Sequence, residues 1–159
     1  MTPSRSADPA FLLDNQLCFL AYRLHRGITD LYRPILAEFG LTYPQYLAML
    51  VLWEQEPITV GGLGERLHLD SGTLSPLLKR LEASGFVLRT RSRTDERSVE
   101  VSLTPAGAAL RSRVKDVPAR IGGCIASTPD QYWSTREGLE ALVARVDTAL
   151  DEDLVSRSS

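Results

Sequence analysis

Apolar residues recur at helical spacing near the start of the chain. Asp8 followed by Pro9 provides an N-cap and a first-turn proline, which predicts that a long helix begins here. Pro34 should kink this helix and Gly40 should end it. The apolar series that defines the helix consists of Leu13, Leu17, Leu20, Leu24, Ile28, Leu31 and Ile35.

Three shorter helices are predicted next. Residues 42–45 have the spacing of a capping box, and they open a strongly apolar helix that runs to about Trp53. A short helical segment over residues 59–67 is weakened by its glycines. A further helix over residues 71–84 stops before a glycine.

The apolar period changes to two over residues 86–103, which predicts a hairpin whose polar tip spans residues 92–98. Two short helices joined by a tight turn and followed by a charged hairpin are typical of a winged helix-turn-helix. This arrangement predicts that the second helix of the pair, over residues 71–84, is the one that reads DNA.

Two more helices complete the chain. Thr104 and Pro105 cap a helix that should continue to about Ile125. Residues 128–131 form a second capping box, which opens a last helix to about Leu150. Four helices, a hairpin and two helices predict a mainly α fold with a small β-hairpin wing.

The predicted recognition helix is amphipathic. Its leucines fall on one face, and its hydroxyl and basic side chains lie on the other, where they could reach base edges and phosphates. The amides at its start add a phosphate site. Pro76 removes a backbone hydrogen bond, and the explanation we consider is that it shapes the helix start. The candidate DNA-binding residues here are Ser71, Thr73, Ser75, Pro76, Lys79 and Arg80.

Arginines occupy every second position along the first strand of the hairpin, so they project from one side of it. At the tip, an arginine beside a carboxylate could enter a narrow minor groove. Arginine-rich hairpins are usually just solvated surfaces, but the position of this one after a recognition helix favours DNA contact. The candidate wing residues are Arg89, Arg91, Arg93, Asp95 and Arg97.

Charge is sorted along the chain, although the whole protein carries a net charge of only −2. Residues 79–97 hold six basic and three acidic side chains, whereas the segment from Asp130 onward holds seven acidic and three basic ones. The local basic patch is compatible with nucleic-acid binding even though the average charge is not.

Composition narrows the class of protein. A chain of 159 residues and 17.6 kDa, with 43% hydrophobic and 24% charged residues, predicts one globular domain. Two cysteines and two histidines are too few for a disulfide scaffold or a metal site, so we expect no cofactor. No apolar run approaches ~20 residues, and residues 1–10 lack a secretion signal, which predicts a cytoplasmic protein without membrane contact. No hydrolase or phosphate-loop motif favours an enzyme.

Residues 95–107, which join the wing pattern Asp-Glu-Arg to Thr-Pro-Ala-Gly, resemble the MarR family of dimeric winged-helix regulators. Residues 13–19 and 70–78 are more specific, because they are similar to the organic hydroperoxide resistance regulators, the OhrR subgroup. The resemblance spans residues 11–124. It implies a winged helix-turn-helix with N- and C-terminal dimerisation helices.

The resemblance also implies a domain plan and a partner. Residues 1–159 would form a single MarR-type domain, with dimerisation helices over 11–40 and 104–152 and a DNA-binding region over 43–103. The protein would be a homodimeric repressor of an inverted-repeat operator in double-stranded DNA, with half-sites about one helical turn apart.

In that subgroup a cysteine at the position of Cys18 reacts with organic hydroperoxide, supported by tyrosines that match Tyr22, Tyr32 and Tyr43. Tyr32 lies 14 residues after Cys18, about 21 Å along one helix, so it could meet Cys18 only from an antiparallel partner chain. Phenolic donors would favour the reactive thiolate. Cys124 resembles the resolving cysteine, which forms an intersubunit disulfide and so releases the DNA.

Three alternatives stay open. Free cysteine is among the most buried residue types, so Cys18 could be an inert core residue. A MarR-type repressor could instead respond to a small aromatic or phenolic ligand, with the cysteines incidental. A thiol peroxidase would need turnover with a reductant, whereas a sensor needs only stoichiometric oxidation. Replacing Cys18 by serine discriminates, because a ligand sensor would still respond.

Overall fold

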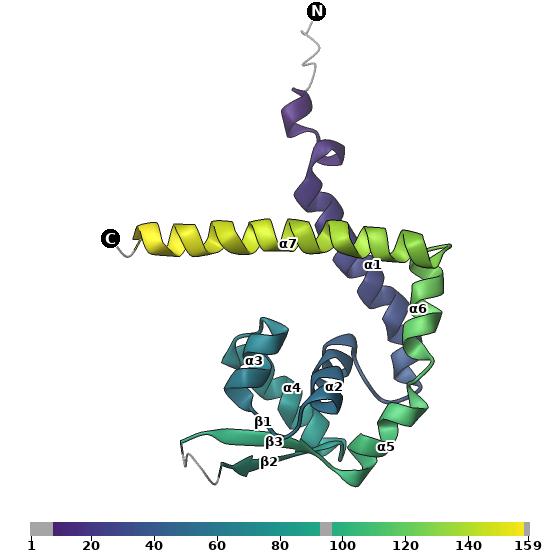
Figure 1. Cartoon of the computed structure of the whole chain (residues 1–159), viewed down its shortest axis with the longest axis vertical. Helices are drawn as coiled ribbons and strands as arrows, with labels where there is room; N and C mark the ends of the chain where they lie inside the picture. Colours follow the sequence, from purple (N-terminus) through teal and green to yellow (C-terminus); the bar gives the residue numbers. More distant parts are fainter. Residues whose placement is uncertain (1–7, 93–96, 158–159) are drawn as a thin grey trace, which may run out of the picture. The chain divides into compact units, whose positions relative to one another are not determined.

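The computed structural model describes residues 8–92 and 97–157 (Figure 1). The chain divides into two compact units, a first one that ends at Lys115 and a second one that begins at Asp116. The helices of the first unit are α1 (Leu17–Ala37), α2 (Tyr43–Glu54), α3 (Val60–Leu67), α4 (Ser71–Ala83) and α5 (Pro105–Arg113).

A small antiparallel sheet combines one short strand that precedes α3 with a hairpin that follows α4. Its strands are β1 (Ile58–Thr59), β2 (Val87–Arg91) and β3 (Val99–Leu103), in the order β1-β3-β2. The hairpin pairs Val87 with Leu103 and Arg91 with Val99, which confirms the predicted wing. Strand β1 was not predicted, because two residues are too short to show a period of two.

The first helix begins later than predicted. Asp8 caps a single 3₁₀ turn, Pro9–Phe11, and a second turn, Leu13–Asn15, follows before α1 starts. The side-chain amides of Asn15 and Gln16 donate to the carbonyls of Pro9 and Ala10 at 2.9 and 2.7 Å. These bonds give the backbone an alternative to a continuous helix, which the spacing of leucines alone did not reveal.

The core of the first unit lies between α2, α4 and the sheet. The capping box predicted at residues 42–45 is present and starts α2. At the other end of α2, the Trp53 indole N–H donates to the carbonyl of Gly107 on α5 at 2.9 Å. The buried apolar side chains of these elements include Tyr46, Met49, Leu52, Leu74, Leu78, Leu81, Val87, Val101 and Leu110.

The second unit consists of α6 (Val117–Ile125) and α7 (Pro129–Arg157). The prediction of one helix from Thr104 to Ile125 was wrong, because α5 ends at Arg113 and α6 begins at Val117. Pro118 lies in the first turn of α6, where a proline fits, whereas it would disrupt a helix interior. Helix α7 also runs beyond the predicted end near Leu150.

Candidate functional site

Helix α4 presents the predicted two faces. Leu74, Leu77, Leu78 and Leu81 are buried. The six predicted DNA-contacting side chains from Ser71 to Arg80 are all exposed. Pro76 lies at the sixth position, inside the helix rather than at its start, and its ring replaces the amide that would donate to the Gly72 carbonyl.

Asp70 organises the start of α4, a role that sequence analysis did not assign to it. One carboxylate oxygen accepts the Thr73 backbone N–H at 2.8 Å, and the other accepts the Thr73 hydroxyl at 3.1 Å. These hydrogen bonds lower the pKa of Asp70 below its ordinary value. The Thr73 hydroxyl is therefore left to accept hydrogen bonds on its outer side. The available signal was the position of Asp70 just before a helix.

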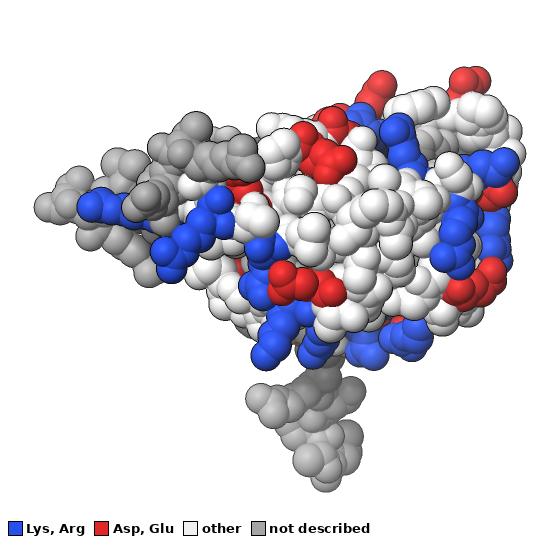
Figure 2. Space-filling view, turned by 90° about the horizontal axis from the view of Figure 1, so that it is seen from below, with Lys and Arg blue, Asp and Glu red and all other residues white. Residues whose placement is uncertain are grey.

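The wing contributes three exposed arginines among the described residues, and the first of them is Arg89 on β2. Arg91 ends β2, and Arg97 lies just before β3. The predicted contacts Arg93 and Asp95 lie outside the described residues. Figure 2 shows Lys and Arg side chains gathered in groups along the margins of the face seen from below, with Asp and Glu among them. On this face the basic side chains therefore form several separate groups and not one continuous patch.

Arg89 on the wing forms an ion pair with Glu82 on helix α4. Its Nε and Nη2 donate to one oxygen of Glu82 at 3.0 and 2.7 Å, and its backbone N–H donates to the other oxygen at 3.3 Å. The guanidinium lowers the pKa of Glu82 below its ordinary range. The sequence did not single out Glu82, because it precedes Arg89 by seven residues across a turn.

A groove joins the recognition helix to the wing. It has a volume of about 730 Å³ and is bounded by the start of α3, one side of α4 and both strands of the wing. Ser75 lines it from α4, and Arg89 and Arg97 line it from the wing. The predicted contacts on helix and wing therefore open onto one concave surface, as binding to a single duplex requires.

Cys18 is an exposed free thiol in the first turn of α1. Tyr22 follows one turn later, with 55% of its surface exposed. Arg26 donates to the Tyr22 hydroxyl oxygen at 3.1 Å, which leaves the phenolic proton able to donate to another acceptor. Cys18 is therefore not a core residue of the single chain.

Tyr32 and Tyr43 come together from α1 and α2. Their rings stack with centroids 4.3 Å apart, and the Tyr46 ring lies 5.8 Å from that of Tyr32. The capping box at residues 42–45 places Tyr43 at the first position of α2. Burial raises the pKa of Tyr43 and of Tyr46 above the ordinary value, so both phenols keep their protons at neutral pH.

The structure does not bring this tyrosine pair to Cys18 within one chain. Cys18 and Tyr32 both belong to the continuous helix α1, so they lie about 21 Å apart along its axis at ~1.5 Å per residue. Tyr22 is the one predicted tyrosine that shares the surface of Cys18. A complete thiol site would need the Tyr32–Tyr43 pair of another chain.

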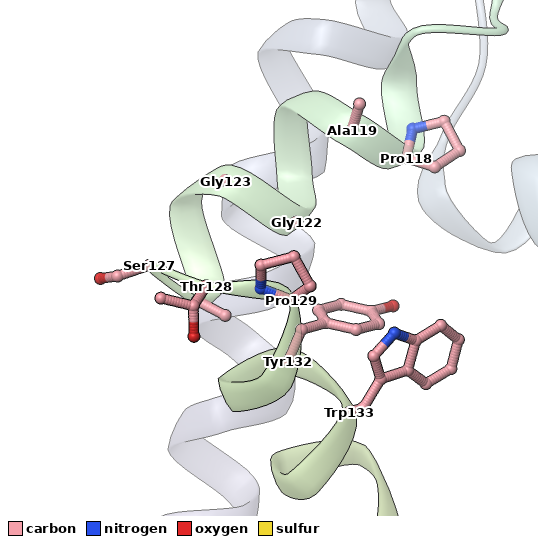
Figure 3. A pocket seen from close by; sticks show the side chains of 10 residues that line it. Pro118, Ala119, Gly122, Gly123, Ser127, Thr128, Pro129, Tyr132 and Trp133 are labelled. Atoms are coloured by element: carbon pink, nitrogen blue, oxygen red, sulfur yellow. The ribbon is translucent and has the colours of Figure 1, made fainter.

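Cys124 is an exposed free thiol in the last turn of α6, in the second unit. Beside this turn, the corner between α6 and α7 holds an open hollow of about 470 Å³ (Figure 3). Gly122 and Gly123 line one side of it, and the rings of Tyr132 and Trp133 lie edge to face at 5.4 Å on the other. The hollow is thus bordered by small and aromatic residues, and Cys124 is not among the residues that line it.

Both units expose apolar side chains along their long helices. On α7 the exposed apolar residues follow the alternating spacing of four and three that is typical of helix pairing. Exposed patches of this kind on a globular protein mark interaction surfaces. They are Leu17, Leu20, Leu24 and Leu31 on α1, and Leu139, Val143, Val146 and Leu150 on α7.

The part of the chain that the structure describes contains neither a membrane-spanning helix nor a cluster of metal-binding side chains. None of its helices is both long enough and apolar enough to cross a membrane. Its histidines, cysteines and carboxylates form no group of three or more that could hold a metal ion.

Comparison with known proteins places the chain in a family. The model of the MarR family matches residues 41–99. The organic hydroperoxide resistance transcriptional regulator of Bacillus subtilis (strain 168) is 47% identical over 131 residues, which cover 82% of this chain and 89% of that protein. This share of both chains extends the likeness well beyond the DNA-binding region.

Solved structures agree with this relationship. Reduced AbfR bound to DNA, from Staphylococcus epidermidis, has a TM-score of 0.78 at 38% identity and covers 87% of this chain and 94% of its own. Disulfide-formed AbfR has a TM-score of 0.62 at 38% identity, over 87% and 92% of the two chains. The winged-helix fold is thereby confirmed, and the protein belongs to the MarR family of transcriptional regulators, which are not enzymes.

Proposed function

We propose that this protein is a homodimeric repressor that releases its operator when an organic hydroperoxide oxidises Cys18. The observation that carries the proposal is the separation of an exposed Cys18 from the stacked pair of Tyr32 and Tyr43. That separation matches a site shared between two chains. The identity to a hydroperoxide resistance regulator supports the same chemistry.

DNA binding follows from α4 and the wing. The exposed hydroxyls of Ser71, Thr73 and Ser75 would read base edges in the major groove, while Lys79 and Arg80 neutralise phosphates. In a two-fold dimer the two recognition helices enter half-sites about 34 Å apart, which predicts an inverted-repeat operator. AbfR, a relative of 38% identity, has been solved on DNA.

Both units of the chain have an exposed apolar face that a second copy of the chain would cover. Pairing through residues 11–40 and 104–152 would cover the apolar faces of α1 and α7, leaving residues 43–103 for DNA. An antiparallel arrangement of two α1 helices would bring Cys18 of one chain to the partner's Tyr32 and the partner's Tyr43. Phenolic donors at the sulfur favour the thiolate form of Cys18.

The redox step has two parts. The Cys18 thiolate attacks the terminal peroxide oxygen, the O–O bond breaks, and the alkoxide leaves and takes a proton to become an alcohol. Cys18 is thereby oxidised to a sulfenic acid by two electrons. The thiolate of the partner's Cys124 then attacks the Cys18 sulfur, a disulfide forms, and hydroxide leaves as water.

The disulfide requires the two cysteine Cα atoms to come within about 7 Å, so it would tie α1 of one chain to α6 of its partner. We expect this constraint to move the wings away from the spacing that the operator demands. Release of DNA is then a consequence of geometry, because the contacts on α4 themselves are unchanged by oxidation.

A non-reducing gel tests the proposal. The reduced protein is treated with an organic hydroperoxide, and a covalent dimer is expected for the wild type and for neither Cys18→Ser nor Cys124→Ser. A reductant should return the wild type to the monomer band. Absence of a covalent dimer in the wild type would exclude the disulfide between Cys18 and Cys124.

Tyr43→Phe is expected to slow the oxidation of Cys18 by about tenfold. A hydrogen bond to a charged group contributes about 1.5 kcal/mol or more, so its loss reduces the thiolate population by roughly that factor. The rate is measured by quenching peroxide reactions at intervals and titrating the remaining thiol.

Tyr46→Phe is the matched control, because it removes a phenolic hydroxyl from the same cluster but from a side chain only 2% exposed. Its oxidation rate should equal that of the wild type. Equal slowing in both variants would mean that Tyr43 acts through packing of the cluster and not by donating to sulfur.

A second function is favoured by the hollow beside α7. Its volume of about 470 Å³ and its aromatic wall suit a small aromatic ligand, as in a ligand-responsive MarR regulator. Such a regulator would release DNA in Cys18→Ser when a phenolic ligand is added, with no peroxide present. The ligand sensor would be favoured if the phenolic ligand releases DNA from Cys18→Ser and peroxide does not release DNA from the wild type.

A further inference from the structure

We propose that Arg89 is a positioning residue that holds the wing against the recognition helix through Glu82, and that it is not a phosphate contact. The inference rests on the DNA-binding part of the proposed function, and it revises the prediction from the sequence that Arg89 touches DNA. It changes what Arg89 does there and gives Glu82 a role in operator binding.

The side of the strand from which Arg89 projects is the first reason, because a side chain on this side, which Arg91 shares, can reach α4 at the position of Arg89. Val87 precedes Arg89 by two residues and is 1% exposed, so both side chains leave β2 on its core-facing side. In the hairpin Arg89 pairs with Val101, which is fully buried. The stem of Arg89 therefore starts over the core and runs toward α4.

The contacts of the guanidinium are the second reason. Glu82, in the last turn of α4, receives three donors from Arg89, two from the side chain at 3.0 and 2.7 Å and one from the backbone at 3.3 Å. The two side chains are only about one-third exposed, at 33% and 35%. The Glu82 carboxylate thus binds both the side chain and the backbone of Arg89. This double attachment fixes the direction of β2 as well as its distance from α4.

This ion pair links two elements that must fit DNA together. Lys79 and Arg80 precede Glu82 by less than one turn of α4, and Arg91 follows Arg89 by two residues on the wing. The spacing between the recognition helix and the wing must match the spacing between the grooves and the backbone of the duplex. A positive charge already paired with a carboxylate contributes little to the release of counterions from DNA.

A charge swap tests the proposal directly, with operator affinity measured by fluorescence anisotropy. We expect Arg89→Glu to lower affinity by about tenfold or more, because two carboxylates then face each other between α4 and β2. Adding Glu82→Arg should restore affinity to within about threefold of the wild type, since the reversed pair rebuilds the brace. If the double variant binds the operator no more tightly than Arg89→Glu, the proposal is overturned. That result is expected of a phosphate contact, because the double variant still carries an acidic side chain at position 89.

Arg91 supplies the matched control, since it lies on the same strand and on the same side. Arg91→Glu should not be rescued by Glu82→Arg. Salt dependence gives an independent measurement: Arg89→Gln should leave the slope of log K against log salt unchanged, whereas Arg91→Gln should reduce it by about one. A reduction of about one in Arg89→Gln would show a phosphate contact and would also overturn the proposal.

Two further measurements keep the outcomes separate. Wild-type binding to the operator is measured first, and its failure would refute DNA recognition itself, not the brace. Arg89→Lys retains the charge and removes the fork geometry, so it covers the case in which a charge-reversed variant fails to fold. We expect weaker binding with an unchanged salt slope, whereas wild-type affinity in Arg89→Lys would contradict the brace.

Discussion

The Cys18→Ser variant is expected to bind operator DNA as tightly as the wild type and to stay bound after treatment with an organic hydroperoxide. Under the same treatment the affinity of the wild type should fall by about 5- to 150-fold, the usual range of coupling between two sites in a switch. The serine hydroxyl cannot form a sulfenic acid or a disulfide, so the dimer keeps its reduced geometry. Operator affinity before and after peroxide measures the effect.

Cys124→Ser is the control that separates oxidation from cross-linking. It should still lose the Cys18 thiol to oxidation, but it should form no covalent dimer and should keep more of its DNA affinity. Peroxide-driven release of DNA from Cys18→Ser would contradict the role of Cys18. If peroxide releases all of the DNA from Cys124→Ser, the sulfenic acid itself, and not the disulfide, moves the wings.

The Gly107→Ala variant is expected to lose about 3 kcal/mol of unfolding free energy, because overpacking of this kind has no room to relax. A Cβ at Gly107 would stand 2.0 Å from the Phe86 carbonyl oxygen. That oxygen also accepts the Thr104 backbone N–H at 3.0 Å, so moving it would break the turn from the wing into α5. Urea denaturation of the reduced protein measures the loss.

Gly61→Ala is the matched control in the same unit, because nothing lies within 4 Å of its added Cβ. Its stability should equal or slightly exceed that of the wild type, since alanine is the better helix former. Equal stability of Gly107→Ala and the wild type would show that α5 packs against the turn at Phe86 less closely than the structure indicates.

The extent to which sequence predicted the fold differs between elements. The capping box at residues 42–45, the leucine face of α4 and the hairpin were all predicted, because each depends on neighbours within a few residues. The two 3₁₀ turns before α1 and the break after Arg113 were missed. Before α1, side-chain hydrogen bonds from Asn15 and Gln16 interrupt a helix that the apolar spacing would continue. After Arg113, Pro118 starts a new helix although the apolar spacing continues.

The candidate site divides in the same way. The sequence identified Cys18, Tyr22, Tyr32 and Tyr43 by residue type and motif, but it could not show that two of these tyrosines stack. It treated Arg89 as equivalent to Arg91, since both occupy alternate positions of one strand. No local pattern connects Arg89 to Glu82, because their contact depends on how the strand crosses the end of a helix.

The sequence by itself determined the succession of helices and strands, the polar face of the recognition helix, and the presence of two cysteines with three candidate tyrosines. Helical and strand periods, caps and turn residues act over short distances, so they can be read from neighbouring letters. Only the tertiary structure decided which side chains of different elements meet: Tyr32 with Tyr43, and Glu82 with Arg89. Side-chain direction and packing set these pairings, and both depend on the whole folded unit.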